Sequence, residues 1–312
     1  MNKKPSENMK LYGLDKYFNE IITLHKNNKM PNKILLSGKR GVGKATLGYH
    51  MINYFLSANE NHKYDCTKFT IDNKNKSYQL ILNKTHPNFY LIDLVDEKKS
   101  IDISQIREMI SYTNKSTFSG SKRFILIDNI ENLNKNSVNA LLKIIEEPND
   151  NIFFILIHNN ATKILPTLKS RCLTFNIFLS FDESIAIANL LVGKSIFEII
   201  NHDLISYYNT PGEFIGLIDF AEEKKIDLMR YTLKNILNLL IDKAYYKKNI
   251  FVKKLIINFI ELYCLKEYRA TNTKSSLLNI YHNLIGKIHN TEKFNLDEES
   301  LFFEFKSKLL NE

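Results

Sequence analysis

The stretch KILLSGKRGVGKAT, residues 33–46, decides the fold of this chain. A short apolar run, Ile34 to Leu36, opens it, and an apolar pattern with helical spacing follows it. Between them stand three of the chain's 10 glycines and a lysine: Gly38, Gly41, Gly43 and Lys44. A buried strand, a glycine loop, a lysine and a helix N-terminus in this order predict a P-loop, whose backbone N–H groups and lysine surround phosphate oxygens.

The residue after the lysine departs from the P-loop pattern. That position normally carries Ser or Thr, whose hydroxyl ligates Mg²⁺, but this chain has Ala45 there. Thr46 comes one place late and lies about 100° further around the helix. The alternative interpretation is a glycine-rich turn that binds nothing. Binding of ATP and Mg²⁺ without turnover therefore stays open.

Composition narrows the classes of protein to be considered. With 312 residues, 44% of them hydrophobic, the chain is long enough for two or three domains. No apolar run is long enough to predict a membrane span. The three cysteines lie far apart, which predicts neither zinc nor a disulfide framework and fits a reducing cytoplasm. The net charge of +9 permits work near DNA, but the lysines are spread along the whole chain.

The order of the apolar segments predicts the architecture. In the first half, strand-like runs alternate with helical patterns, and the strands are apolar on both faces, which predicts an α/β domain with a parallel sheet covered by helices. The polar, asparagine-rich residues 57–84 are interpreted as an insertion or exposed connection. The second half has only helical patterns. We expect a P-loop domain over residues 1–178, a helical lid over 179–224 and a helical collar over 225–312.

The segment FILIDNIE, residues 124–131, is the candidate partner of the P-loop. In ATP-hydrolysing P-loop proteins an aspartate at a strand end positions Mg²⁺, and Asp128 fits that role. A following glutamate commonly polarises the attacking water, but Asn129 occupies this position and an amide is no base. Glu131 is expected to point elsewhere. Hydrolysis at this chain's own site is therefore not expected.

Arg171 is the charge of greatest interest outside the loop. It lies in Ser170–Arg171–Cys172, after a helical turn that begins at Pro166. An arginine at a domain edge can reach a phosphate bound by a neighbouring subunit, and its planar fork of N–H groups suits this role better than an ammonium. The alternative is a surface arginine in a local salt bridge.

Taken together, the motifs resemble a known family. The segments LLSGKRGVGKATL, ISQIREMI, NALLKIIEEP, NIFFILI and ILPTLKSRC, within residues 10–178, are similar to those of bacterial clamp-loader subunits of the AAA+ class, above all the delta-prime family of DNA polymerase III. The segment NTPGEFIGL, residues 209–217, resembles the family's lid, although Glu213 stands where a basic residue is common. This departure puts a second-sensor contact to phosphate in doubt.

The resemblance implies a role in a hetero-pentameric ring with motor subunits and a delta subunit, which opens the sliding clamp and places it on primed DNA. It implies that Arg171 is given to the ATP of the adjacent motor subunit, that Asn159 and Asn160 lie at the first sensor, and that the helical tail forms a collar. Related subunits carry a four-cysteine zinc module, but residues 57–84 keep only Cys66, so no zinc is expected.

The sequence thus predicts a non-motor subunit of the clamp loader in the cytoplasm. Ala45 and Asn129 both weaken the chain's own nucleotide site, while Arg171, which would serve a neighbour, is intact. Two alternatives remain. One is an active AAA+ motor subunit in which Thr46 replaces Ala45 at Mg²⁺. The other is a P-loop nucleotide kinase, against which the long helical tail and the missing acceptor-site arginine cluster argue.

Overall fold

A computed structural model describes residues 4–95, 98, 100–115, 122–146, 151–160, 164–247, 249–270, 281–288, 290 and 298–310. The chain divides into two compact units. The first contains residues 1–188 and 210–213, and the second contains residues 189–209 and 214–312. The division into domains ending at residues 178 and 224 stays a prediction.

The first unit is built on a five-stranded parallel sheet. Its strands are β1 (Lys33–Gly38), β2 (Phe89–Ile92), β3 (Arg123–Ile127), β4 (Ile152–His158) and β5 (Leu173–Ile177). Their order in the sheet is β2-β3-β4-β1-β5, so β1 lies between β4 and β5. In the register, Leu35 pairs with Leu156 on one side and Thr174 on the other. All the pairs are parallel, so the carboxyl ends of these strands meet at one edge, where α/β sheets place ligands.

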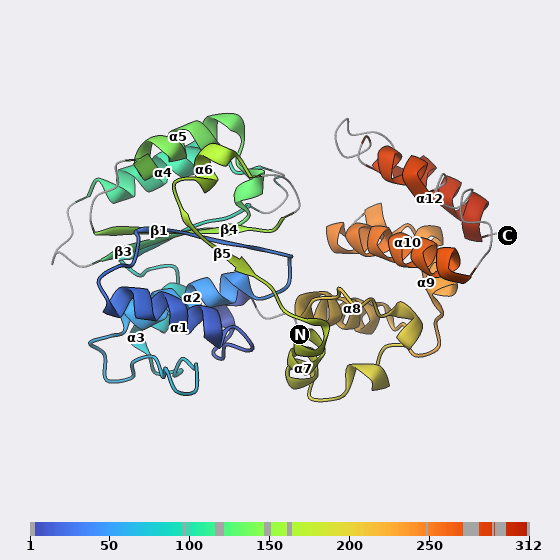
Figure 1. The fold of residues 1–312 in the computed structure, drawn as a ribbon, viewed down its shortest axis with the longest axis horizontal. Helices are drawn as coiled ribbons and strands as arrows, with labels where there is room; N and C mark the ends of the chain where they lie inside the picture. The colour runs from blue at the N-terminus through green and yellow to red at the C-terminus, as the bar shows by residue number, and fades with distance from the viewer. Residues whose placement is uncertain are drawn as a thin grey trace. The chain divides into compact units, whose positions relative to one another are not determined.

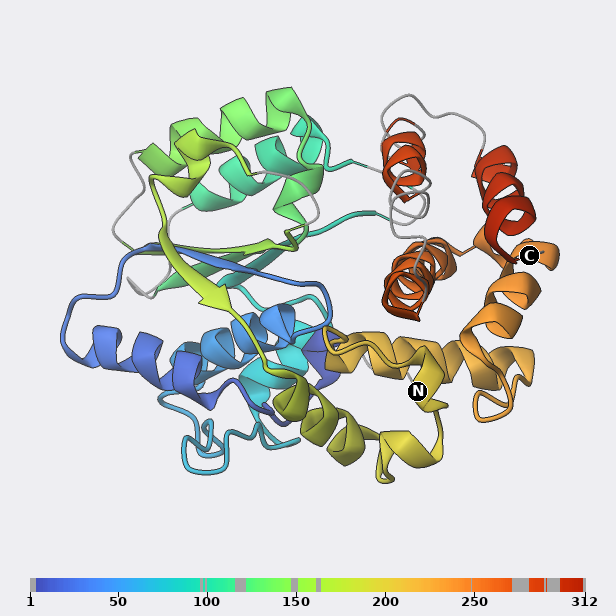
Figure 2. The same ribbon diagram turned by 45° about the vertical axis from the view of Figure 1, so that its right-hand side comes forward.

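Helices cover both faces of this sheet (Figures 1 and 2). One face carries α1 (Asp15–Lys26), α2 (Lys44–Leu56) and α3 (Lys76–Leu82), while the other carries α4 (Ile103–Thr113), α5 (Lys135–Glu146) and the short α6 (Pro166–Lys169). Short 3₁₀ turns at Pro5–Glu7 and Ile130–Asn132 complete the unit, and α7 (Phe181–Val192) follows β5. The predicted α/β class with a helix-covered parallel sheet is confirmed.

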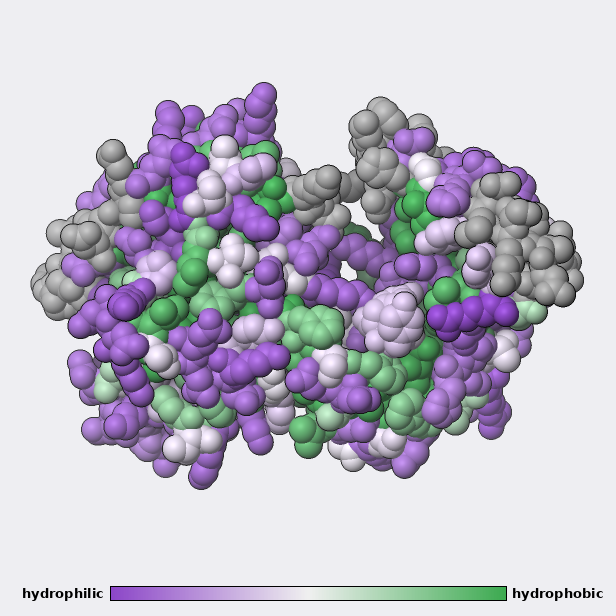
Figure 3. Space-filling model, in the orientation of Figure 1, coloured by the Kyte–Doolittle hydropathy of each residue, from purple (hydrophilic) through white to green (hydrophobic). Residues whose placement is uncertain are grey.

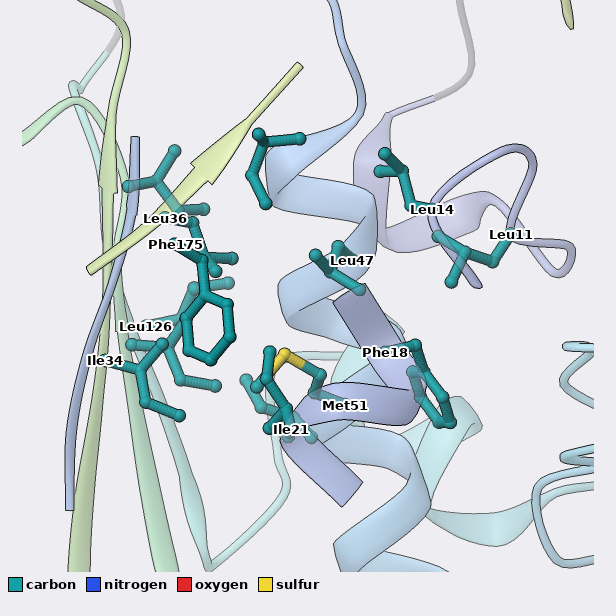
Figure 4. Packing of buried hydrophobic residues seen from close by; sticks show 14 of the residues in the cluster. Leu11, Leu14, Phe18, Ile21, Ile34, Leu36, Leu47, Met51, Leu126 and Phe175 are labelled. Atoms are coloured by element: carbon teal, nitrogen blue, oxygen red, sulfur yellow. The ribbon is translucent and has the colours of Figure 1, made fainter. Parts of the chain in front are cut away.

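Two apolar layers hold the helices to the sheet. Successive residues of a strand point to opposite faces, so Ile34 and Leu36 join the layer under α1 and α2, while Leu35 joins the layer under α4 and α5. Figure 4 shows the first layer, in which Leu47 and Met51 lie between the strands and Phe18 of α1. These side chains are almost fully buried, which explains why the strands are apolar on both faces.

Residues 57–84 are not simply an exposed connection, so this prediction is wrong in part. The segment contains α3, whose N-cap Asn75 accepts a 2.7 Å hydrogen bond from the backbone N–H of Tyr78. Its apolar residues Tyr64, Ile71, Tyr78 and Ile81 are buried in the layer with α1 and α2. They are widely spaced among polar residues and therefore leave no periodic pattern in the sequence.

The second unit is helical in the part of the chain that the structure describes. Most of α8 (Pro211–Lys224) belongs to it, together with α9 (Leu233–Asp242), α10 (Ile250–Ala270) and α12 (Glu298–Phe305). Short turns lie at Ile196–Glu198, His202–Leu204 and Tyr245–Lys247, and a π-helical turn, Lys306–Leu310, follows α12. The apolar stripes of α9 and α10 are buried, as their spacing predicts. The predicted all-helical second half is confirmed for these residues.

The face of the molecule drawn in Figure 3 is largely polar. Hydrophilic residues cover most of the face drawn in Figure 3, with hydrophobic residues between them. Among the described residues, no helix combines the length and the apolar character that a membrane crossing requires.

Candidate functional site

The P-loop joins β1 to α2, and its glycines are required by its geometry. Gly41 and Gly43 have φ angles of 86° and 94°, in the left-handed region that side chains disfavour. Gly38 has a different reason, since a Cβ there would lie 2.3 Å from the backbone oxygen of Ile177. The loop predicted from the sequence is therefore present as a strand–loop–helix turn.

Lys44 is buried at the start of α2 and is bound by the loop itself. Its Nζ donates hydrogen bonds to the carbonyl oxygens of Gly38 and Lys39, at 2.9 and 2.7 Å. Burial lowers the pKa of Lys44 to about 8, against the opposing effect of the nearby Asp128 and Glu131 carboxylates. The ammonium group that would meet a phosphate is thus held by backbone oxygens.

The residues after Lys44 offer little to a metal ion. Ala45 is partly buried against the apolar layer of the sheet. The hydroxyl oxygen of Thr46 accepts a 3.4 Å hydrogen bond from the side-chain amide of Asn8. No group of three or more His, Cys, Asp or Glu side chains that could hold a metal occurs among the described residues. This donor set does not fit the usual Mg²⁺ site of a P-loop protein.

Asp128 and Asn129 lie at the carboxyl end of β3, as predicted. Burial and the neighbouring Asp93 raise the pKa of Asp128 to about 6. Its Oδ1 accepts a 2.7 Å hydrogen bond from the backbone N–H of Asn129. Asn129 adopts a φ of 54° and donates from Nδ2 to Oδ1 of Asp93, at 2.7 Å. The side chain in the position of the catalytic glutamate is therefore turned toward β2.

Of the two sensor-like asparagines, Asn159 takes part in the same cluster and Asn160 bonds to β1. Asn159 Nδ2 donates to Asn129 Oδ1 at 2.8 Å and to Glu131 Oε1 at 2.9 Å. Asn160 Oδ1 accepts a 2.8 Å bond from the hydroxyl of Ser37, at the end of β1. The Glu131 carboxylate accepts hydrogen bonds from Asn159, and its expected orientation away from the attacking water stays a prediction. We refer to Asp93, Asn129, Glu131 and Asn159 as the amide network.

The sequence analysis missed Asp93 and Ser37, which also lie at the carboxyl-end edge of the sheet. Asp93 follows β2 directly, and Ser37 is the penultimate residue of β1. The signal that could have found them is their position, since polar residues at the carboxyl ends of parallel strands meet at one edge of the sheet.

Arg171 lies at a separate edge, between α6 and β5. Its side chain is 35% exposed, and it forms a 2.7 Å ion pair from NH2 to Oε1 of Glu146, at the end of α5. NH1 donates to the carbonyl oxygen of Thr167, also at 2.7 Å. Two of the five guanidinium N–H donors are thus used. These contacts fit the alternative interpretation of Arg171 as a surface arginine in a local salt bridge. The remaining N–H donors are available to bind a phosphate.

The neighbours of Arg171 have structural roles. Ser170 donates a 3.2 Å hydrogen bond to the same Thr167 carbonyl and closes the short helix α6. Burial raises the pKa of the Cys172 thiol to about 11, so this thiol is neutral and is no nucleophile at physiological pH.

The first turn of α8 reaches the P-loop, and the sequence analysis missed this contact. Thr210 is followed by Pro211, Gly212 and Glu213, the pattern of a capping box with proline at the first helical position. The Glu213 carboxylate accepts a 2.9 Å bond from the backbone N–H of Thr210. It also forms a 3.0 Å ion pair with Lys39 of the loop. The capping pattern T-P-G-E could have been read from the sequence, but the partner Lys39 could not.

Comparison with known proteins agrees with the motif order. Residues 13–179 match the family model described as DNA polymerase III, delta subunit. DNA polymerase III subunit delta' of Pseudomonas aeruginosa is 30% identical over 138 residues, which cover 44% of this chain and 40% of that one. The delta' subunit of Buchnera aphidicola subsp. Schizaphis graminum is 28% identical over 262 residues, covering 83% and 76%.

Among solved structures, a gamma subunit-related protein from Thermotoga maritima is similar, with a TM-score of 0.49, 15% identity and coverage of 93% and 98%. The chain spans less than half the length of the Pseudomonas relative. The family match itself covers more than half of the chain and includes both the P-loop and Arg171. The chain belongs to the delta-prime clamp-loader family of DNA polymerase III.

Proposed function

We propose that this chain is a non-motor subunit of a replicative clamp loader. In this role it helps to place a sliding clamp on primed DNA and does not hydrolyse ATP at its own site. It works in the cytoplasm, in a hetero-pentameric ring with motor subunits and a delta subunit, and the helical second unit serves as the collar. Family membership over residues 13–179 supports this assignment.

The observation that carries the non-motor assignment is the amide network. A P-loop ATPase needs a base or an orienting group beside the attacking water. Here the position after Asp128 is an asparagine whose two amide ends are bonded to Asp93 and Asn159, both within 2.8 Å. Neither end accepts a proton from water. Because the Ala45 side chain has no metal-binding atom, the proposed mechanism uses no nucleotide bound to this chain.

Arg171 performs the chemistry that we assign to the chain. The guanidinium would swing from Glu146 toward the ATP of the adjacent motor subunit and stabilise the negative charge that develops on the transferred phosphoryl group. Its exposure supports this role, because a 35% exposed side chain with a half-exposed partner can exchange one anion for another. The chain thus supplies position and charge, and the neighbour holds the substrate.

The experiment is reconstitution with candidate motor subunits. The purified chain should co-elute with them and raise their clamp- and DNA-stimulated ATPase. Arg171→Ala should co-elute equally well but fail to raise the rate. Arg230→Ala is the matched control, since Arg230 is 84% exposed and forms a local ion pair with Asp227. Failure of the wild-type chain to co-elute with any motor subunit would contradict the proposal.

The active motor alternative has its own assay. Hydrolysis by the isolated chain that is lost in Lys44→Ala would establish it. The position of Thr46 argues against it, because the hydroxyl that would replace Ala45 at Mg²⁺ is bonded to Asn8. Phosphoryl transfer to a nucleoside monophosphate would establish the kinase alternative, which the family match does not support.

A further inference from the structure

We propose that the P-loop of this chain binds the first turn of α8, and that the Glu213 carboxylate is the anion it holds. The loop takes this helix start in place of a nucleoside triphosphate. We call the contact between residues 39–41 and 210–213 the latch. All of its residues belong to the first unit. The latch is a property of the isolated chain and is separate from the role of Arg171.

The two backbones of the latch touch directly. A Cβ on Gly212 would lie 2.7 Å from the Cα of Gly41, and a Cβ on Gly41 would lie 2.4 Å from the hydroxyl oxygen of Thr210. Distances under about 3 Å are far inside van der Waals contact. Glycine is therefore needed on both sides, and no space for a phosphate remains between these segments.

Hydrogen bonds fix the latch at two successive loop carbonyls. The Thr210 hydroxyl donates to the carbonyl oxygen of Arg40, and the Gly212 N–H donates to that of Gly41, both at 3.0 Å. The first N–H groups of a helix have no partner within the helix. Here a P-loop carbonyl supplies a partner for one of these N–H groups, which stabilises the start of α8.

An ion pair also stabilises the latch. Lys39 is paired with Glu213, whose side chain is only 20% exposed, and Lys44 is held by two loop carbonyls. A triphosphate would have to displace these partners and would also meet the Glu213 carboxylate. A capping box accounts for the bond between Glu213 and Thr210, but it requires neither the Lys39 pair nor the contact between the two glycines.

Two variants test the latch by different routes. Glu213→Gln keeps the capping box, since glutamine serves at this position, but removes the charge beside Lys39. Gly212→Ala places a methyl group against Gly41. The matched controls are Glu222→Gln, at an exposed position on the same helix, and Gly286→Ala, at a helical position where, outside its own helical backbone, no described residue lies within 4 Å of the added methyl.

The readouts are the affinity of each isolated chain for a fluorescent ATP analogue with Mg²⁺ and the exchange rate of the Gly212 amide. We expect wild-type binding to be weak and the Gly212 amide to be protected. Glu213→Gln should bind the analogue about fivefold to tenfold more tightly, the effect of removing one nearby anion at a partly exposed site. Gly212→Ala should also bind it more tightly, because the added methyl group forces residue 212 away from Gly41. The controls should match the wild type, and Gly212→Ala should also speed exchange of the residue 212 amide.

Two results would overturn the proposal. One is that neither Glu213→Gln nor Gly212→Ala binds the analogue more tightly than the wild type. The other is that the wild-type chain binds ATP tightly while its Gly212 amide stays protected, since the nucleotide and the latch would then coexist. If Gly212→Ala does not fold, the comparison of Glu213→Gln with Glu222→Gln decides the question alone.

Discussion

The P-loop and the Arg171 edge both carry basic side chains, but the partners of these side chains differ in their exposure to solvent. At the P-loop, Lys44 is buried and held by loop carbonyls, and Lys39 is paired with Glu213. At the Arg171 edge, the guanidinium is 35% exposed and its carboxylate partner, Glu146, is 50% exposed. The first region buries Lys44 and pairs Lys39, itself 41% exposed, with a carboxylate that is only 20% exposed, while the second keeps both partners of its ion pair within reach of solvent.

This difference indicates what each region contributes. Removing a partner from a buried charge is costly, because it leaves a charge without compensation, whereas an exposed ion pair contributes little and exchanges partners easily. We therefore interpret the P-loop as part of the architecture and the Arg171 edge as the part that acts on a neighbour.

The largest expected effect comes from altering the loop's backbone. Gly41→Ala should lower the free energy of unfolding by about 2–4 kcal/mol, because it strains a left-handed residue and forces apart a packed contact. A Cβ there would lie 2.4 Å from Thr210, at a φ of 86°. Urea denaturation measures the effect. Gly286→Ala, in open space, should not be destabilised. Equal urea midpoints for Gly41→Ala and Gly286→Ala would contradict a structural role of the loop.

An intermediate effect is expected at Asp128. Because burial raises its pKa to about 6, the folded chain binds a proton that the unfolded chain has lost, and the free energy of unfolding falls as pH rises from about 4 to 6. Asp128→Asn should remove this slope and raise the free energy of unfolding by about 2–3 kcal/mol at pH 7.5, with little change at about pH 3.5, below both pKa values. Urea titrations at the two pH values make the comparison. A loss of stability at pH 7.5 would show that Asp128 is needed as an anion.

The smallest effect is expected at the Arg171 edge. Glu146→Gln should change the free energy of unfolding by less than about 0.5 kcal/mol, because the pair is exposed and its energy is screened by water and salt. Thermal or urea denaturation at low and high salt measures this. A loss of more than about 1 kcal/mol would mean that the ion pair is structural, and Arg171 could then not be released cheaply to a phosphate.

Much of the fold follows from local sequence. The strand β1 and its glycines could be predicted because a left-handed turn at Gly41 and Gly43 leaves a direct mark in the residue types. The helices α9 and α10 could be predicted because their buried stripes are periodic. The sequence misled us over residues 57–84, where isolated apolar residues become buried through long-range contacts.

The site was predictable in its parts but not in its connections. Asp128, Asn129, Asn159 and Arg171 could be named from motif order, and the positions of the first three at the carboxyl ends of β3 and β4 follow from the parallel sheet. The bonds among them depend on which strands are neighbours and how each side chain turns. The pair of Lys39 and Glu213 spans 174 positions, and no local pattern predicts such a partner.

The most direct test of the account compares two variants in one reconstituted ring. Lys44→Met keeps an unbranched side chain of similar size but removes the charge of Lys44, while Arg171→Ala removes the exposed guanidinium. With equal assembly confirmed by gel filtration, we predict that Lys44→Met leaves the clamp- and DNA-stimulated ATPase of the ring unchanged and that Arg171→Ala lowers it. The reverse result, a rate lost with Lys44→Met and kept with Arg171→Ala, would contradict the account.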